Sequence, residues 1–346
     1  MASPPMHTID TDALVIGAGP VGLFQAFQLG LQGIACHIVD ALPHVGGQCA
    51  ELYADKPIYD IPGLPVCTGR ELVERLTQQL SPFKPTLHLG QTVETLHATQ
   101  DGRWSVATNT GTAWTAKTVF IAAGVGAFVP RSLPIEGLAP HLSQQIWFGS
   151  QALPSFAAQH LLVCGDGDTA LQTCLDALGT AASVTLMHRR EQFSAEAGRT
   201  AAFAAAQTAG RLRFAAGQPT GLVVEGERLT ALEYLNADGD TLALPCDQLV
   251  MALGLSPKLG PVAQWGMQIE RKQLVVSTDT FATSAPGIFA VGDINTYPGK
   301  KKLILCGFHE ATLAAFGAAA HLWPDAKTLL QYTTTSTTLH QRLGLI

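Results

Sequence analysis

Two glycine-rich turns in this chain could each hold the pyrophosphate group of a dinucleotide. Glycine permits a tight turn from strand to helix and lets the backbone approach the phosphates, while a helix N-terminus favours negative charge. Each turn follows a short apolar run, at 13–16 and at 161–163. The residues predicted to contact dinucleotides are Gly17, Gly19, Pro20 and Gly22 in the first turn and Gly165, Gly167, Asp168, Thr169 and Ala170 in the second.

The residues that follow the two turns at equal spacing predict different dinucleotides. Asp40 stands eighteen residues after Gly22, where a carboxylate accepts hydrogen bonds from ribose hydroxyls and repels a 2′-phosphate. Eighteen residues after Ala170 comes a basic run, His188, Arg189 and Arg190. Because arginine forms paired hydrogen bonds with phosphate, this run predicts NADP(H) at the second turn. A solvated basic surface is the alternative interpretation of the run.

Composition limits the classes of protein to which the chain can belong. Its 346 residues suit about two domains, and 47% hydrophobic content against 14% charged content allows sizeable cores. A net charge of −6 without a basic stripe argues against nucleic acid as a partner. We expect no membrane span, because no apolar run approaches the roughly 20 residues required. The N-terminal residues do not resemble a signal peptide, so we expect a cytoplasmic protein.

The seven cysteines predict neither a disulfide framework nor a metal site. Their number is odd, and no two are separated by two residues. Reduced, buried thiols are therefore expected, and we predict no metal ligands.

The apolar runs predict an α/β fold with two Rossmann-like dinucleotide-binding domains, the second inserted into the first. We place the FAD-binding domain at 1–125 and 256–346 and the NADP-binding domain at 126–255. The segment 43–69 is expected to be a loop, and a helix is expected from about Phe308 to Leu322. Each domain repeats the order strand, helix, strand, with a later strand that ends in glycine.

Asp293 follows a short apolar strand and is a candidate contact for the polyol chain of a flavin. The helix expected from Phe308 would direct its positive end to the same place, where reduced flavin carries negative charge. An ordinary Gly-Asp turn is the alternative for Gly292-Asp293.

Taken together, these motifs resemble the two-dinucleotide flavoproteins that include thioredoxin reductases, and most closely their ferredoxin/flavodoxin–NADP⁺ reductases. The resemblance extends over almost the whole chain. The segments that carry it, besides the two turns, are Gly46-Gly47-Gln48, Leu52-Tyr53, Lys56–Gly63, His188–Phe193, Gly292–Lys300, Leu303–Ala311 and the tail from Tyr332.

The chain departs from the disulfide reductases of this group at one place. Those enzymes carry Cys-x-x-Cys just before the second nucleotide unit, whereas the stretch 141–149 here contains no cysteine. Without a dithiol, electrons must leave the flavin directly, which favours a one-electron acceptor such as ferredoxin or flavodoxin.

The resemblance also implies roles for individual residues. Asp40 would bind the adenosine ribose of FAD, and Tyr53 and Tyr332 would stack on opposite flavin faces, although a core tyrosine and a loose surface tail are the alternatives. His309 is a possible tuning residue for the flavin, with a plain helix-terminal or core histidine preferred. The further FAD contacts implied are Gly47, Gln48, Val93, Phe128, Asp293 and Thr334.

The sequence thus predicts an FAD-dependent oxidoreductase, a homodimer by resemblance, that transfers electrons between NADP(H) and ferredoxin or flavodoxin. Hydride would pass between nicotinamide C4 and flavin N5, so no side chain is predicted to be catalytic. The run Lys300–Lys302 is a candidate docking site for an acidic acceptor, and a solvated loop is its alternative. Two other functions stay open: an NADPH-dependent reductase of free flavin, quinone or oxygen, and a non-catalytic flavin redox sensor.

Overall fold

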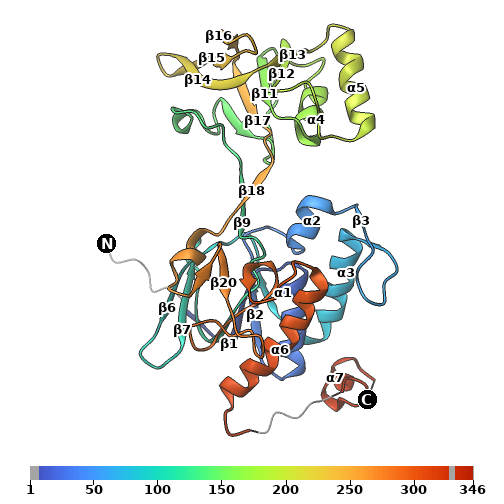
Figure 1. Ribbon diagram of the computed structural model, residues 1–346, viewed down its shortest axis with the longest axis vertical. Coiled ribbons are helices and arrows are strands. Elements are labelled where there is room, and N and C mark those ends of the chain that lie inside the picture. The colour runs from blue at the N-terminus through green and yellow to red at the C-terminus, as the bar shows by residue number, and fades with distance from the viewer. Residues whose placement is uncertain (1–7, 327–331, 346) are drawn as a thin grey trace. The chain divides into compact units, whose positions relative to one another are not determined.

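The computed structural model describes residues 8–326 and 332–345. The chain divides into two compact units, of which the first comprises Met1–Ala127 with Lys258–Ile346 and the second Phe128–Pro257. The second unit is thus inserted into the chain of the first. Its boundaries, at 128 and 257, each lie two residues after the expected 126 and 255. Strands β9 (Ala127–Pro130) and β18 (Leu255–Lys258) carry the chain between the units and pair with each other (Figure 1).

A seven-stranded sheet forms the centre of the first unit, in the order β5-β2-β1-β8-β7-β6, with β21 also paired to β8. The C-terminal parts of β1, β2 and β8 and all of β21 are apolar and buried, as expected for the centre of a sheet covered on both faces. The strands are β1 (Thr8–Ile16), β2 (Cys36–Val39), β5 (Thr86–His88), β6 (Val93–Ala98), β7 (Trp104–Thr108), β8 (Ala113–Ile121) and β21 (Ile288–Ala290).

Three long helices pack in the first unit: α1 (Pro20–Leu31), α3 (Gly69–Leu80) and α6 (Ile304–Leu322). α1 contacts both α3 and α6 (Figure 1). The side chain of Thr68 accepts a hydrogen bond from the Glu71 amide and the Glu71 side chain bonds back, so that a capping box begins α3.

Two expectations for this unit were wrong. The segment 43–69 is not all loop, because α2 (Gly47–Tyr53) begins after Gly46, whose φ of 119° lies in the left-handed region. α6 begins at Ile304 rather than near Phe308. Gly307 therefore lies inside the helix. A Cβ at this position would come 2.4 Å from Val21 Cγ2, so the glycine allows α6 to pack closely on α1.

The second unit contains a five-stranded parallel sheet in the order β10-β17-β11-β12-β13. Helices α4 (Asp168–Asp176) and α5 (Ala197–Thr208) contact each other beside it. A separate antiparallel sheet, β14-β15-β16, was not anticipated from the sequence. The strands are β10 (Ile146–Phe148), β11 (His160–Cys164), β12 (Ser183–His188), β13 (Arg213–Ala216), β14 (Gln218–Glu225), β15 (Arg228–Leu235), β16 (Thr241–Pro245) and β17 (Gln248–Met251).

The predicted α/β architecture of two Rossmann-like domains, one inserted into the other, is therefore confirmed. Within the described ranges, no helix is both long enough and apolar enough to cross a bilayer. The smaller elements are β3 (Pro57–Ile58), β4 (Cys67–Thr68), β19 (Ile269–Glu270), β20 (Gln273–Val275), β22 (Asn295–Thr296), α7 (Thr337–Arg342) and the 3-10 turns η1 (Ser81–Phe83), η2 (Ala139–His141), η3 (Gly260–Gln264) and η4 (Gly292–Ile294).

Candidate functional site

The first glycine turn leaves no room for side chains between β1 and α1. Gly17 has a φ of +114°, and a Cβ there would come 2.4 Å from the carbonyl oxygen of Ala122. A Cβ on Gly22 would come 1.9 Å from the carbonyl oxygen of Gly17. Both positions therefore require glycine on steric grounds, as a close strand-to-helix turn does.

The N-terminus of α1 is open to a ligand. Gly19 is the N-cap residue and supplies no side-chain cap, and Pro20 follows at the start of the helix. A second glycine loop lies against the first, since a Cβ on Gly47 would come 3.0 Å from Gly19 Cα. This side-chain-free cradle with free helix amides fits the pyrophosphate of FAD.

Asp40 lies directly beside this turn, at the end of β2. Its Oδ2 accepts a hydrogen bond of 2.5 Å from the Ala18 amide, and its Oδ1 accepts one of 2.8 Å from the Leu42 amide. Burial raises the pKa of this carboxyl, while the two amide hydrogen bonds oppose the shift. A carboxylate oxygen can accept more than one hydrogen bond, so Asp40 can also accept from ribose hydroxyls.

Gln48 and Asp293, two predicted FAD contacts far apart in sequence, come together in the structure. Gln48 Nε2 donates a 3.3 Å hydrogen bond to Asp293 Oδ2. Gly124 allows this approach, because a Cβ there would come 3.1 Å from Gln48 Nε2. Gln273 Nε2 donates to the backbone oxygen of Asp293 over 3.0 Å and holds the turn from the other side.

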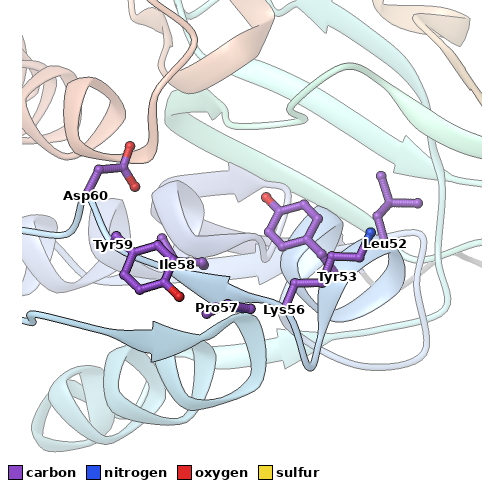
Figure 2. Close-up of a pocket in the computed structure, with 7 residues that line it drawn as sticks. All are labelled: Leu52, Tyr53, Lys56, Pro57, Ile58, Tyr59 and Asp60. Carbon is purple, nitrogen blue, oxygen red and sulfur yellow. The ribbon is translucent and has the colours of Figure 1, made fainter. Parts of the chain in front are cut away.

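Tyr53 ends α2 and borders a surface pocket of about 650 Å³. Cys49 Sγ donates a 3.5 Å hydrogen bond to its hydroxyl. Burial, this hydrogen bond and the carboxylates of Asp293 and Asp60 raise the pKa of the phenol, so it stays neutral. Figure 2 shows the pocket, with side chains from α2 at one side and Tyr59 and Asp60 at the other; it is lined by Leu52, Tyr53, Lys56, Pro57, Ile58, Tyr59 and Asp60.

A buried polar cluster that sequence reasoning missed joins α6 to the Asp293 turn. The Glu310 side chain is 0% exposed and that of Lys300 is 7% exposed, and they form an ion pair of 2.5 Å. Glu310 Oε2 accepts from the Gly292 amide at 2.7 Å and from Asn295 Nδ2 at 2.8 Å. Its Oε1 accepts from the Tyr297 hydroxyl at 3.0 Å. An acid among alanines on an otherwise apolar helix face was the available sequence signal.

This Glu310 cluster fixes the turn η4, which carries Asp293, against the first turns of α6. Lys300 Nζ also donates a 2.8 Å hydrogen bond to the carbonyl oxygen of Gly292. Cβ atoms on Gly292 and Gly307 would both contact Val21, in the first turn of α1, at 3.4 and 2.4 Å. The N-terminal ends of α1 and α6 therefore meet, and both direct positive dipole ends toward the cofactor cradle.

His309 is exposed and lies beyond the first turn of α6. Its ring meets that of Phe281 edge-on, with 6.5 Å between centroids. Val93 is 5% exposed and belongs to the core of the first unit. Phe128 lies in β9, and its side chain is outside what the structure describes.

The C-terminal tail is anchored on η1. Arg342 Nη1 donates to the Pro82 carbonyl oxygen at 3.5 Å, and the guanidinium lies 5.3 Å from the Phe83 ring centroid. Tyr332 is 68% exposed, and Thr334 is also exposed. Because η1 follows the C-terminal end of α3, the anchor lies away from Tyr53, whose carbonyl oxygen would be 2.7 Å from a Cβ on Gly69, at the other end of α3. The roles of Tyr332 and Thr334 remain predictions.

The second glycine turn repeats the steric design of the first. Gly165 has a φ of +154°, and a Cβ there would come 2.3 Å from the carbonyl oxygen of Ala252 and 3.0 Å from Ala170 Cβ. Ala170 is fully buried, so alanine fills the place of a third glycine. Gly167 is the N-cap of α4 without a side-chain cap, and Thr169 is exposed in the first turn.

The two aspartates of this turn hold the segment that follows β12. Asp168 Oδ1 accepts a 2.8 Å hydrogen bond from the Glu196 amide and an ion-paired one from Arg199. Asp166 Oδ2 accepts from Ser194 Oγ at 3.2 Å. These bonds fix the start of α5 to the turn, so Asp168 also orients neighbouring protein segments.

The basic run lines a pocket of about 810 Å³ in the second unit. His188 Nδ1 lies 2.9 Å from the Arg190 carbonyl oxygen, and its Nε2 lies 3.9 Å from Asp166 Oδ2. Arg189 and Arg190 are exposed, and neither forms an ion pair with a carboxylate in the described part of the chain. Two free guanidinium groups at the end of β12 can thus receive a phosphate.

The seven cysteine side chains are free thiols, most of them buried. Burial raises the pKa of Cys36 and of Cys246 to about 12, which makes these thiols poor nucleophiles. The described residues include no cluster of three or more His, Cys, Asp or Glu side chains able to hold a metal ion.

Comparison with known proteins identifies the family. The model of the pyridine nucleotide-disulphide oxidoreductase family matches residues 11–312. A ferredoxin–NADP reductase from Paracidovorax citrulli is 56% identical over 348 residues, with 97% of each chain covered. Ferredoxin–NADP reductase 2 from Cupriavidus metallidurans is 51% identical over 343 residues, covering 99% of this chain and 94% of the relative.

Solved structures agree on the fold. The thioredoxin reductase of T. acidophilum has a TM-score of 0.56 at 20% identity, covering 90% of this chain and 98% of its own. The bacillithiol disulfide reductase of Staphylococcus aureus has a TM-score of 0.62 at 15% identity, covering 90% and 99%. With its two glycine turns and its full-length relatives, the chain belongs to the pyridine nucleotide-disulphide oxidoreductase family and, within it, to the ferredoxin–NADP reductases.

Proposed function

We propose that this protein binds FAD in its first unit and NADP(H) in its second, and transfers electrons between NADP(H) and ferredoxin or flavodoxin. The observation that carries the proposal is the difference between the two turns. Asp40 stands beside the first, whereas the exposed Arg189 and Arg190 stand beside the second. The names of the full-length relatives support the choice of ferredoxin.

Bound FAD would supply the redox chemistry, since it accepts hydride from a nicotinamide and releases electrons one at a time. The amides at the N-terminus of α1 would hold its pyrophosphate, and Asp40 its adenosine ribose. Gln48 and Asp293, joined by their hydrogen bond, would bind along the flavin side of the molecule. Tyr53 would cover one flavin face, and the α6 N-terminus would stabilise negative charge on the reduced ring.

Electron transfer without an enzyme disulfide is part of this proposal. The stretch 141–149, where the disulfide reductases of this group carry Cys-x-x-Cys, lacks cysteine, and the thiols are free. We further propose that the protein works in the reducing cytoplasm, where free thiols persist, and as a homodimer.

Anaerobic addition of NADPH to the purified holoprotein tests the enzyme function. We expect the visible flavin absorbance to bleach within the assay, and an unchanged spectrum would favour a redox sensor. Cytochrome c reduction by NADPH then tests the acceptor. Ferredoxin or flavodoxin should accelerate it, whereas an unchanged rate would favour a reductase of free flavin, quinone or oxygen.

Replacing both arginines of the basic run tests the assignment of NADP(H). The double variant Arg189→Ala/Arg190→Ala should weaken NADPH binding by about 1.5–3 kcal/mol for each charge-assisted bond lost. NADH binding should change little, because NADH has no 2′-phosphate. An equal loss for both nucleotides in flavin-reduction kinetics would contradict the assignment.

A further inference from the structure

An exposed surface at the N-terminal end of α6 combines positive charge with apolar side chains. We call Lys301, Lys302, Leu303 and Leu305 the α6 entry surface. Both lysines are exposed, and the two leucines are 43% and 39% exposed. Within the described residues neither lysine has a carboxylate partner, whereas the preceding Lys300 is paired with Glu310.

The α6 entry surface is held firmly and close to the proposed flavin site. Lys300 is anchored by Glu310 and by the carbonyl oxygen of Gly292, which precedes Asp293 directly. Lys301 therefore directly follows the buried and anchored Lys300 in the chain. On the other side, Gly307 packs on Val21 at the start of α1. With both ends fixed, the backbone of this surface loses little conformational entropy when a partner binds.

The chemistry of this surface selects an acidic protein. Leu303 and Leu305 provide exposed apolar area and the two lysines provide positive charge, and transient interfaces commonly combine the two. The free amides at the α6 N-terminus add positive potential. The chain as a whole has a net charge of −6, which repels an acidic partner, so the α6 entry surface provides a local attraction for such a partner.

We propose that the α6 entry surface is the docking site for an acidic one-electron carrier of the ferredoxin or flavodoxin type. This inference rests on the proposed function and adds to it the surface that receives the partner. The pocket beside Tyr53 is a weaker choice, because Lys56 and Asp60 both line it and their charges offset each other.

Charge reversal on this surface provides the test. In the holoenzyme, Lys301→Glu/Lys302→Glu should lower kcat/KM for reduction of ferredoxin by about tenfold at low ionic strength, because steering of an acidic partner is lost. The difference should shrink as salt is added. The NADPH-dependent rate with menadione, an uncharged acceptor, should stay unchanged, which shows that flavin and NADPH sites are intact.

A matched control carries the same charge change on the second unit. Arg211→Glu/Arg213→Glu alters two exposed residues, and β13 pairs Arg213 with Thr185, away from His188. This control should keep the parental kcat/KM for ferredoxin. An equal loss in both double variants would overturn the docking site, because net charge alone would then explain the effect.

Further outcomes decide between sources of failure. If the parent reduces menadione but not ferredoxin or flavodoxin, the proposed function fails. If the parent reduces ferredoxin and the Lys301→Glu/Lys302→Glu variant matches it, only the docking site fails. Carbodiimide cross-linking to ferredoxin should place the bonds at Lys301 or Lys302. Sedimentation with phosphatidylglycerol vesicles that the same variant abolishes would assign the surface to a lipid bilayer and overturn the proposal.

Discussion

Removal of the Glu310 charge should destabilise the first unit severely. In Glu310→Gln, the ammonium of Lys300, whose side chain is 7% exposed, keeps its buried place without a counter-charge. Breaking a buried ion pair by removing one partner costs about 3–5 kcal/mol. The change also forces one amide oxygen and one amide nitrogen into a site where both carboxylate oxygens accept hydrogen bonds. We therefore expect a loss at the upper end of that range.

A double-mutant cycle isolates the part due to the ion pair. Lys300→Met removes the ammonium but leaves Glu310 three donors, namely the Gly292 amide, Asn295 and Tyr297. Because the double variant Glu310→Gln/Lys300→Met leaves neither charge unpaired, its cost should fall below the sum of the single costs by about 2 kcal/mol or more. Lys301→Met, at the exposed neighbour, should change stability by less than about 0.5 kcal/mol.

Urea unfolding of the holoprotein, followed by the fluorescence of released flavin, measures these differences in the unit that should hold the cofactor. The FAD concentration must be equal in all samples, since bound ligand adds to apparent stability. Strictly additive single costs, or a Glu310→Gln loss below about 1 kcal/mol, would refute the claim that this pair holds the Asp293 turn against α6.

Other parts of the structure give further predictions. Gly17→Ala should yield protein that lacks the visible absorbance of bound FAD, because the added Cβ would lie 2.4 Å from the Ala122 carbonyl oxygen. By contrast, a Cβ at Gly198 on α5 would meet no neighbouring atom, so Gly198→Ala should raise the free energy of unfolding in urea by about 1 kcal/mol. The pKa of Asp247 is lowered by hydrogen bonds from the His160 amide and Arg228, so its stabilisation is present above the ordinary aspartate pKa of about 3.9 and is lost as pH falls below it. Asp247→Asn should therefore flatten the acid limb of a stability–pH curve, and an unchanged limb would contradict the assignment. Thiols counted with a disulfide reagent in denaturant should be equal before and after NADPH reduction, and two additional thiols would reveal an unrecognised disulfide.

The glycine turns and the alternation of strands and helices could be predicted because their determinants are local. Gly17 and Gly165 stand where no side chain fits, and the apolar runs before them form buried parallel strands. The spacing to Asp40 and to the basic run follows from the length of one helix and one strand. For these reasons, sequence alone identified both turns and the inserted architecture.

The errors arose where packing between distant segments decides the local structure. The helix was expected from about Phe308, yet α6 begins at Ile304 and includes Gly307, which allows it to approach Val21. Gly46 and Gly47 suggested a loop, whereas they form the entrance to α2. The run Lys300–Lys302 was interpreted as a docking site or, alternatively, a solvated loop, but the Lys300 side chain is buried in an ion pair with Glu310. Residue spacing could not predict this burial. The partner, Glu310, is ten residues further along the chain, in the second turn of α6, and only the packing of α6 brings it to Lys300.

The Glu310 cluster explains how one short segment can serve two demands. The turn at Asp293 must be rigid to place a carboxylate beside Gln48, and Lys301 and Lys302 must remain free to meet a partner. The buried Lys300 meets both requirements. Its ammonium binds the Gly292 carbonyl oxygen and Glu310, which fixes the backbone from which Lys301 and Lys302 extend. A loss of flavin affinity in Glu310→Gln should therefore accompany weaker ferredoxin docking, whereas Lys301→Glu/Lys302→Glu should weaken docking alone.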